Sequence, residues 1–559
     1  MRRVLAGFVL GALALFGISC GSVETELESP PARPNIVLML VEDLSPRIGA
    51  LGDAVALTPN LDRLAREGVR YTHVFASAGV CAPSRAALIT GMHQTSITAQ
   101  HMRTSVYAWA DGTGRRGYEA TPPAFVKAFP ELLRAAGYYT INNSKTDYQF
   151  GSPFTIWDEN GVDADWINRA DGQPFFAMYS QQVTHESGLF GPDGIAKQGA
   201  AVPALQASEA RRAALPHRTR PEDVVVPPYY PDTPVVRSQI AQQYDNVQLM
   251  DAWVGERLAE LEARGVLENT IVIWATDHGD GLPRAKRSLY DSGLHTPMIV
   301  RFPGGGRAGQ ADERMISFVD MAPTILALAG VNAPAHLPGQ DAFAPAAAGQ
   351  EQVFASRDRL DEWPDLGRAI RTRDFKYIRN EYPDAPLYLP LTYRENLPIM
   401  AELRRLHAEG ALTPLQDSYF LTPRAAEELY DLRADPHETI NLADDPAYTA
   451  RKMELAAALS AWRMQIGDPG KLAEDQLIRA AWGADEQPTT RAPTLQQTSA
   501  GTVRLESATA GASIGYRLND EPRWRLYTAP FPAVAGARVE AKAIRYGFKE
   551  SDVATMVLK

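Results

Sequence analysis

The sequence predicts an α/β protein with a mainly parallel central sheet, followed by smaller antiparallel parts. Two continuous apolar runs, 36–41 and 271–275, have the length and character of strands buried on both faces. Each run ends at a polar pair: Glu42-Asp43 after the first and Asp277-His278 after the second. Ligands of open α/β sheets bind beyond the carboxyl ends of the strands, so these pairs mark a candidate site.

The N-terminus predicts export. Residues 1–20 begin with two arginines after Met1, continue as an apolar run too short for a stable membrane span, and end in small residues. The end of the run resembles a bacterial lipoprotein signal in which Cys20 takes up a lipid. Gly17 stands where that pattern prefers Leu, so a plain signal peptide is the alternative. We expect a chain exported to the periplasm or cell surface and anchored, if at all, only through this lipid.

The other elements follow in chain order. TPNLDRLAREG, 58–68, predicts a capped helix, and PFFAMYSQQVTHES, 174–187, a strand that runs into polar residues. Short antiparallel strands and a helix at 448–464 indicate a subdomain, and the tail alternates with the β period. The expected division is a linker at 21–33, a catalytic domain at 34–354, a C-terminal subdomain at 355–482, a linker at 483–498 and a small β-sandwich at 499–559.

Composition limits the classes of partner and of cross-link. The formal net charge of −11 argues against nucleic acid as a partner. The chain has two cysteines, so if Cys20 is lipidated or removed, Cys81 has no intramolecular partner. An inert buried cysteine is the simplest interpretation of Cys81, and a cysteine that takes part in chemistry is the alternative.

The neighbourhood of Cys81 points to a family. Cys81-Ala82-Pro83-Ser84-Arg85, followed by Leu88-Ile89-Thr90-Gly91, resembles the signature of the type I sulfatases. In that family the cysteine is oxidised to formylglycine, an aldehyde, by a formylglycine-generating maturation enzyme. The resemblance covers most of 34–465 and includes 58–71, 286–304 and 429–438. It implies an alkaline-phosphatase-like sandwich fold with an antiparallel C-terminal subdomain, and a hydrolase acting on sulfate esters.

The resemblance also implies roles for individual residues. One calcium ion per chain would be held by Glu42, Asp43, Asp277, His278 and the formylglycine at Cys81. The family usually has Asp-Asp where this chain has Glu42-Asp43. Oxygen ligands favour calcium over zinc, although an imidazole is not a typical calcium ligand. Arg85 would hold the nucleophile, Lys145 and Lys286 would bind sulfate, and His185 would bind sulfate or protonate the leaving group.

One departure leaves part of the mechanism open. The second family signature usually ends in a histidine that deprotonates the aldehyde hydrate, and this chain has Asp147 in that place. The base for sulfate release is therefore Asp147 itself, or His101 or His295 reaching in from elsewhere in the chain.

The substrate is indicated only by class. Residues 226–251 resemble the heparan N-sulfatase branch, which suggests a sulfated carbohydrate without deciding between N- and O-sulfate. Arg359 and Asp361 either line the sugar site or form a solvated charged run. The tail resembles the C-terminal β-module of bacterial chitobiases, in which Trp524 and Tyr527 either pack in the core or stack on sugar.

The sequence thus predicts an exported sulfatase that acts on a sulfated glycan. Two alternatives remain: a phosphate or phosphonate ester hydrolase of the same superfamily, and a glycan-binding protein without catalysis.

Overall fold

The computed structural model describes residues 33–104, 117–498 and 501–559. The predicted signal peptide, Cys20 and all of the first linker except Arg33 lie outside the described residues. Within those ranges, every helix is too short or too polar to cross a membrane.

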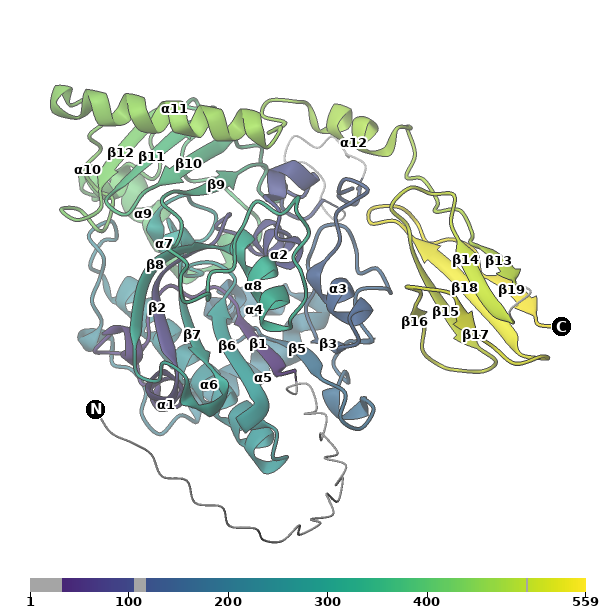
Figure 1. Cartoon of the computed structure of the whole chain (residues 1–559). Coiled ribbons are helices and arrows are strands. Elements are labelled where there is room, and N and C mark those ends of the chain that lie inside the picture. Colours follow the sequence, from purple (N-terminus) through teal and green to yellow (C-terminus); the bar gives the residue numbers. More distant parts are fainter. Residues whose placement is uncertain (1–32, 105–116, 499–500) are drawn as a thin grey trace, which may run out of the picture. The chain divides into compact units, whose positions relative to one another are not determined.

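An eight-stranded mixed sheet forms the centre of the catalytic part (Figure 1). Its only antiparallel partner strand is β7; the other described pairs are parallel. In spatial order the strands are β4 (Glu159–Asn160), β3 (Tyr139–Asn143), β5 (Phe175–Gln181), β1 (Asn35–Val41), β6 (Thr270–Thr276), β7 (His295–Arg301), β2 (Val69–Phe75) and β8 (Ala311–Ser317). The predicted strands β1 and β6 are direct neighbours, with Val41 opposite Thr276, so the polar pairs that follow them begin side by side.

Helices cover both faces of this sheet, because the strands are apolar on both sides. On one face, Ile36, Leu38 and Leu40 of β1 pack with α2, α3 and α8. On the other face, Val37 and Met39 pack with α1 and α6. These helices are α1 (Pro59–Glu67), α2 (Cys81–Thr90), α3 (Phe129–Ala135), α6 (Pro234–Ala263) and α8 (Met321–Leu328).

Local sequence explains where these helices begin and end. α1 follows Thr58, starts with Pro59 at its first position and ends before Gly68. A Cβ at Gly68 would clash with the backbone carbonyl of Val300, so only glycine allows the helix to end against β7. α6 starts with Pro234, and the Thr233 hydroxyl accepts a hydrogen bond from the Val236 amide at 3.3 Å.

The remaining helices lie mainly at the surface or in connections. They are α4 (Pro192–Ala196), α5 (Val202–Ala213), α7 (Asp291–Leu294), α9 (Pro398–Ala408), α10 (Pro414–Asp417) and α12 (Glu474–Trp482).

The predicted antiparallel subdomain is a four-stranded sheet with one long helix across it (Figure 1). The strands are β9 (Val353–Arg357), β10 (Gly367–Arg371), β11 (Phe375–Asn380) and β12 (Glu427–Asp431), and the helix is α11 (Thr449–Gln465). Trp462 of α11 stacks on Phe354 with ring centroids 4.8 Å apart and donates its Nε1–H to His93 Nε2 at 3.2 Å. His93 comes just after α2, so this contact ties the subdomain to the catalytic core.

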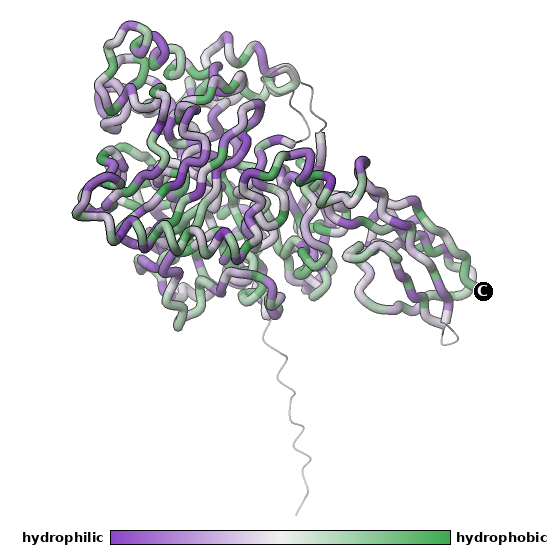
Figure 2. Tube along the Cα trace, turned by 90° about the horizontal axis from the view of Figure 1, so that it is seen from above, coloured by the Kyte–Doolittle hydropathy of each residue, from purple (hydrophilic) through white to green (hydrophobic). Residues whose placement is uncertain are grey.

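The tail contains two small antiparallel sheets with their own apolar core. The strands are β13 (Thr494–Gln497), β14 (Thr502–Glu506), β15 (Ser513–Leu518), β16 (Arg525–Leu526), β17 (Phe531–Pro532), β18 (Arg538–Ile544) and β19 (Ala554–Val557). Apolar and polar segments alternate along these strands, as Figure 2 shows. β13 lies within the residues predicted as a linker. Tyr527 packs against this core, which is the first of the two interpretations given above.

The tail also contacts α3 through a buried carboxylate. Glu131 is 5% exposed and accepts hydrogen bonds from the hydroxyls of Ser513 and Tyr546, the latter at 2.8 Å. Arg134 donates to the backbone carbonyl of Trp524. The resemblance of the tail to the chitobiase module stays a prediction.

Candidate active site

The site lies where β1 and β6 end. The Asp277 amide donates to Val41 O at 2.9 Å, and the Asp43 amide donates to Asp277 Oδ1 at 3.1 Å. Asp43 has a left-handed backbone, φ 49°, a conformation that Asp tolerates better than most residues. All four members of the two polar pairs are buried. The chain therefore turns sharply at both strand ends and keeps these side chains together under the surface.

Cys81 is the first residue of α2 and is fully buried. Its Sγ lies 3.7 Å from Asp43 Oδ1, 3.3 Å from His278 Nε2 and 3.4 Å from Lys286 Nζ. Burial acts to raise the pKa of the Cys81 thiol, but the nearby Lys145 and Lys286 lower it to about 6. The position that the sequence singled out thus lies among the predicted ligands and cations.

Three cations surround this position, and each faces a carboxylate. Arg85, one turn after Cys81, donates from Nε to Asp277 Oδ2 at 3.0 Å and from an Nη to Glu42 Oε1 at 3.2 Å. Lys145 Nζ lies 2.7 Å from Glu42 Oε2. Lys286 Nζ lies 2.7 Å from Asp43 Oδ2. The buried charges of the site are therefore paired with one another.

His185 lies at the edge of the same cluster. Its Nε2 is 3.9 Å from Glu42 Oε2, and its Nδ1 is 2.9 Å from the Ser187 hydroxyl. Its side chain is 11% exposed. The contact with Ser187 fixes the ring and leaves Nε2 directed at the site, where it can bind an anion or transfer a proton.

Electrostatic interactions move the pKa values of Asp43 and His278 in opposite directions. Burial acts to raise the pKa of Asp43, yet Lys286, His185 and His278 hold it well below its usual value. Burial acts to lower the pKa of His278, but Asp277 and Asp43 raise it to about 10. The low pKa of Asp43 means that its carboxylate is ionised in the site.

The donor atoms fit a divalent cation. One ligand atom from each of Asp43, Cys81, Asp277 and His278 lies within 4.8 Å of the others. Glu42 belongs to a second set of the same size, with Asp43, Cys81 and His185. Ionised carboxylate oxygens are the ligands preferred by hard cations. Both oxygens of Glu42 face cationic side chains, so its part in such a site is less direct than that of Asp43 or Asp277.

The three candidate bases are placed differently. Asp147 borders the site, with Oδ2 3.5 Å from Lys145 Nζ and Oδ1 3.6 Å from an Nη of Arg103. His101 Nδ1 instead lies 2.7 Å from the Tyr118 hydroxyl and 3.3 Å from Glu474.

His295, at the start of β7, bonds through Nε2 to the backbone carbonyl of Thr72 at 2.8 Å and stacks on Phe75. Burial lowers the pKa of His295 to about 4. The structure therefore brings only Asp147 of the three into the surroundings of Lys145.

The two proposed sugar contacts are held in buried ion pairs. Arg359 pairs with Glu474 at 3.0 Å and lines a cavity of about 490 Å³ that also includes His101. Asp361 accepts from Arg287 at 3.2 Å. Both residues are buried, so they do not form the solvated charged run that was one of the two interpretations of this segment.

Sequence reasoning missed a supporting pair beside the predicted residues. The Glu186 amide donates to Asp43 Oδ2 at 2.8 Å, and the Glu186 carboxylate accepts two bonds from Arg287 at 2.8 and 2.9 Å. Arg287 has a left-handed backbone, φ 71°. Both residues follow predicted ones directly, after His185 and Lys286, and that adjacency was the available signal.

Comparisons with known proteins agree with this geometry. The family model named Sulfatase matches residues 34–331, and a second model, N-sulphoglucosamine sulphohydrolase, C-terminal, matches 284–381. An ulvan-active sulfatase from Formosa agariphila is 42% identical over 95% of this chain and 92% of its own length. Human N-sulphoglucosamine sulphohydrolase is 29% identical over 82% of this chain and 95% of its own.

Solved structures share the fold. One, in complex with its substrate D-glucosamine-2-N,6-O-disulfate, has a TM-score of 0.55 and 19% identity, over 80% of this chain and 99% of that one. A phosphonate monoester hydrolase of Agrobacterium radiobacter has a TM-score of 0.51 and 19% identity, over 79% of this chain and 99% of that one. The predicted alkaline-phosphatase-like fold and the enzyme class are confirmed. This chain belongs to the sulfatase family, whose members are hydrolases.

Proposed function

We propose that this sulfatase hydrolyses sulfate esters or sulfamates of a sulfated carbohydrate, with formylglycine formed from Cys81 as the nucleophile and one bound Ca²⁺ per chain. The observation that carries the proposal is the position of Cys81 among two carboxylates, a histidine and a lysine, all buried. The substrate class is supported by relatives whose names state activity on ulvan or on N-sulphoglucosamine.

The formylglycine and the cation would each supply part of the chemistry. A hydrated formylglycine supplies two hydroxyls on one carbon, one to attack sulfur and one whose deprotonation expels sulfate. A divalent cation would be held by Asp43, Asp277, His278 in its neutral form and the residue at 81, and it would act as a Lewis acid towards that hydroxyl and the sulfate oxygens.

The chain's own side chains do the rest. Lys145 and Lys286 present ammonium groups to sulfate oxygens, where negative charge grows in the transition state. Arg85 holds Asp277 and Glu42 in place through its two donors. His185 Nε2 carries the proton that the departing oxygen or nitrogen needs. Asp147, next to Lys145, is the base for sulfate release.

The decisive experiment combines mass and turnover. In protein from the native host, the tryptic peptide with Cys81 should be about 18 Da lighter than the thiol form, whereas ordinary oxidation of cysteine adds mass. The same preparation should release sulfate from sulfated oligosaccharides, and Cys81→Ala should not. A chelator should abolish turnover, and Ca²⁺ should restore it.

The alternatives give different results. Faster turnover of a matched aryl phosphate or phosphonate than of the aryl sulfate would establish the ester hydrolase of the same superfamily. An unmodified thiol with tight glycan binding would establish a binding protein. Sulfate release from N-sulfated and from O-sulfated glucosamine, measured separately, shows which bond is cleaved.

We also propose export with lipidation at Cys20, on the strength of the sequence of residues 1–20. Mass analysis of the mature N-terminus tests this, because an acylated Cys20 and a chain cleaved without lipid differ by the mass of the acyl groups.

A further inference from the structure

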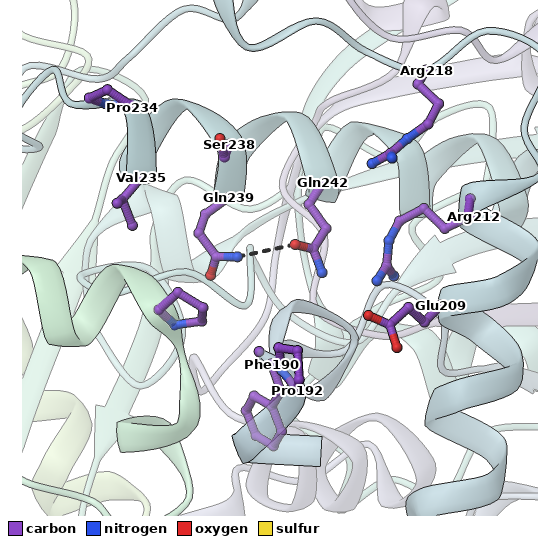
Figure 3. Close-up of a pocket in the computed structure, with 13 residues that line it drawn as sticks. Phe190, Pro192, Glu209, Arg212, Arg218, Pro234, Val235, Ser238, Gln239 and Gln242 are labelled. Carbon is purple, nitrogen blue, oxygen red and sulfur yellow. Dashed lines mark hydrogen bonds between the residues drawn. The ribbon is translucent and has the colours of Figure 1, made fainter. Parts of the chain in front are cut away.

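A second cavity, of about 540 Å³, lies beside the loop that carries His185. Its walls come from α5, the first turns of α6, Phe190 to Pro192 and the start of α9 (Figure 3). The volume falls in the range of sites for small organic ligands. The cavity is not part of the candidate active site, since none of the residues assigned to that site lines it.

Arg212 is the unusual feature of this cavity. It is 6% exposed and donates to two neutral acceptors, Gly188 O at 3.2 Å and Asn246 Oδ1 at 3.0 Å. Among the residues that the structure describes, no carboxylate forms an ion pair with it, although Glu209 lines the same cavity. Burial lowers the pKa of Arg212, which is the expected cost of a desolvated cation. Glu209 and Asp245 attract this charge only from beyond ion-pair distance, so the guanidinium can still form a direct, charge-assisted pair with an anionic ligand.

The other polar groups of the cavity are arranged differently. Arg218 is paired with Asp245 at 2.9 Å and is half exposed. Gln239 is 4% exposed and donates from Nε2 to Gln242 Oε1 at 3.2 Å, as the dashed line in Figure 3 shows. Its Oε1 has no hydrogen-bond partner within the described part of the chain. Gln239 Oε1 is closed off from the cavity, so Arg212 is the group through which the cavity would hold a charged ligand.

The apolar wall completes the pattern. Figure 3 shows Phe190 and Pro192 below the two glutamines of α6. Flat apolar surface beside amide groups suits a sugar ring, which has C–H faces and hydroxyl edges, while Arg212 requires an acid on that sugar.

We infer that this cavity binds an acidic saccharide unit, with its carboxylate or sulfate group on Arg212 and its ring against Phe190 and the glutamine side chains of α6. The nature of the ligand rests on the proposed function. The segment Glu186–Leu189 connects the active site to the side chains of the cavity: Gly188 O accepts from Arg212 and, at 2.9 Å, from Gln242, and His185 lies three residues before Gly188. Phe190 packs on Tyr393, whose ring also lies near His185.

The test is calorimetric binding to the full chain. The probes are an unsulfated oligoglucuronate, a sulfated oligosaccharide without uronate, and a neutral oligosaccharide of equal length. Arg212→Met should weaken binding of the oligoglucuronate about tenfold or more, as expected for loss of a charge-assisted pair. It should do the same for the sulfated probe when both are measured in a Lys286→Met background, where the active site competes less for sulfate. Ser238→Trp, at an exposed position on the cavity rim, should do the same by filling the space. Ala252→Trp, exposed farther along α6, is the matched control and should bind as the wild type does.

Each outcome decides something. A preference for one acidic probe identifies carboxylate or sulfate as the ligand group. Equal binding of acidic and neutral probes, or wild-type affinity in both cavity variants, overturns the inference. Lys286→Met separates the two sites, because it should leave binding of oligoglucuronate unchanged. If the protein releases no sulfate but still binds oligoglucuronate, the proposed function is wrong and the inference about the cavity is retained. If it releases sulfate but does not bind oligoglucuronate in the cavity, only the inference about the cavity is wrong.

Discussion

Buried cations are neutralised in two ways in this molecule. In the active site Arg85, Lys145 and Lys286 each lie within 3.2 Å of a carboxylate oxygen. In the cavity beside α5 and α6, the hydrogen bonds of Arg212 within the described residues go to a backbone carbonyl and an amide oxygen, and Glu209 and Asp245 attract it from a longer distance. In the first arrangement every cation is already in direct contact with a carboxylate, which holds the reacting groups in place. The second is incomplete, which is typical of a binding site and not of a structural ion pair.

Removing one cation from each region should give the largest contrast. Arg85→Met leaves Asp277 and Glu42 buried without this partner, so we expect a loss of about 3–5 kcal/mol in the free energy of unfolding. Arg212→Met loses two hydrogen bonds but also removes a charge whose burial is not matched by a direct ion pair, so a change within about 1 kcal/mol is expected. Urea unfolding with a chelator present measures both. Equal losses would mean that Arg212 is neutralised in some other way.

Within the active site, Asp147 should matter for rate and less for stability. If it is the base for sulfate release, Asp147→Asn should lower kcat roughly 100-fold, a typical contribution of a general base. The first turnover should still release the desulfated sugar, so a burst followed by slow steady-state turnover is expected. Asp147→His, which restores the usual family residue, should keep most of the rate. Unchanged kcat in Asp147→Asn would leave His101 to be tested next.

His93 shows a third way to bury a titratable group, which is to keep it neutral. Burial lowers the pKa of His93 to about 4, below the value near 6.5 of an unfolded chain. A depressed pKa contributes stability that is present above pH 6.5 and is lost as the pH falls towards 4. At pH 5 the free energy of unfolding should be lower by about 2 kcal/mol through this group.

His93→Gln, which keeps an acceptor for Trp462, should remove that part of the pH dependence; urea midpoints at pH 7 and pH 5 measure it. The exposed His217→Gln is the control. A parallel decrease in wild type and His93→Gln would contradict the assignment.

The sequence was most informative where strand ends carry polar pairs. The apolar runs of β1 and β6 predicted two buried parallel strands, and the structure adds that they are direct neighbours in the sheet. Position within family motifs led to Cys81, Arg85, Lys145, His185 and Lys286, which the structure brings together. The antiparallel direction of β7 was not visible, because a buried apolar strand looks the same in either direction.

The parts that could not be predicted depend on long-range packing. Nothing near Arg212 in the chain shows that Gly188 and Asn246 will be its partners. The tail was expected as a separate module, yet its hydroxyls at Ser513 and Tyr546 bond to Glu131 of α3. A single charged residue in an amphipathic helix gives no sign of a partner 415 positions away.

The complete burial of Cys81 also sets an order of events during the life of the chain. Cys81 is the first residue of α2, and its side chain is enclosed by the loops after β1 and β6, with 0% exposure. These loops lie far apart along the chain, since the bond from Asp43 to Asp277 spans 234 positions. A maturation enzyme of the proposed kind therefore has to reach Cys81 before the second half of the sheet is in place. Once β6 docks beside β1, a thiol that has escaped oxidation is enclosed, and the folded molecule is no longer a substrate for its own activation.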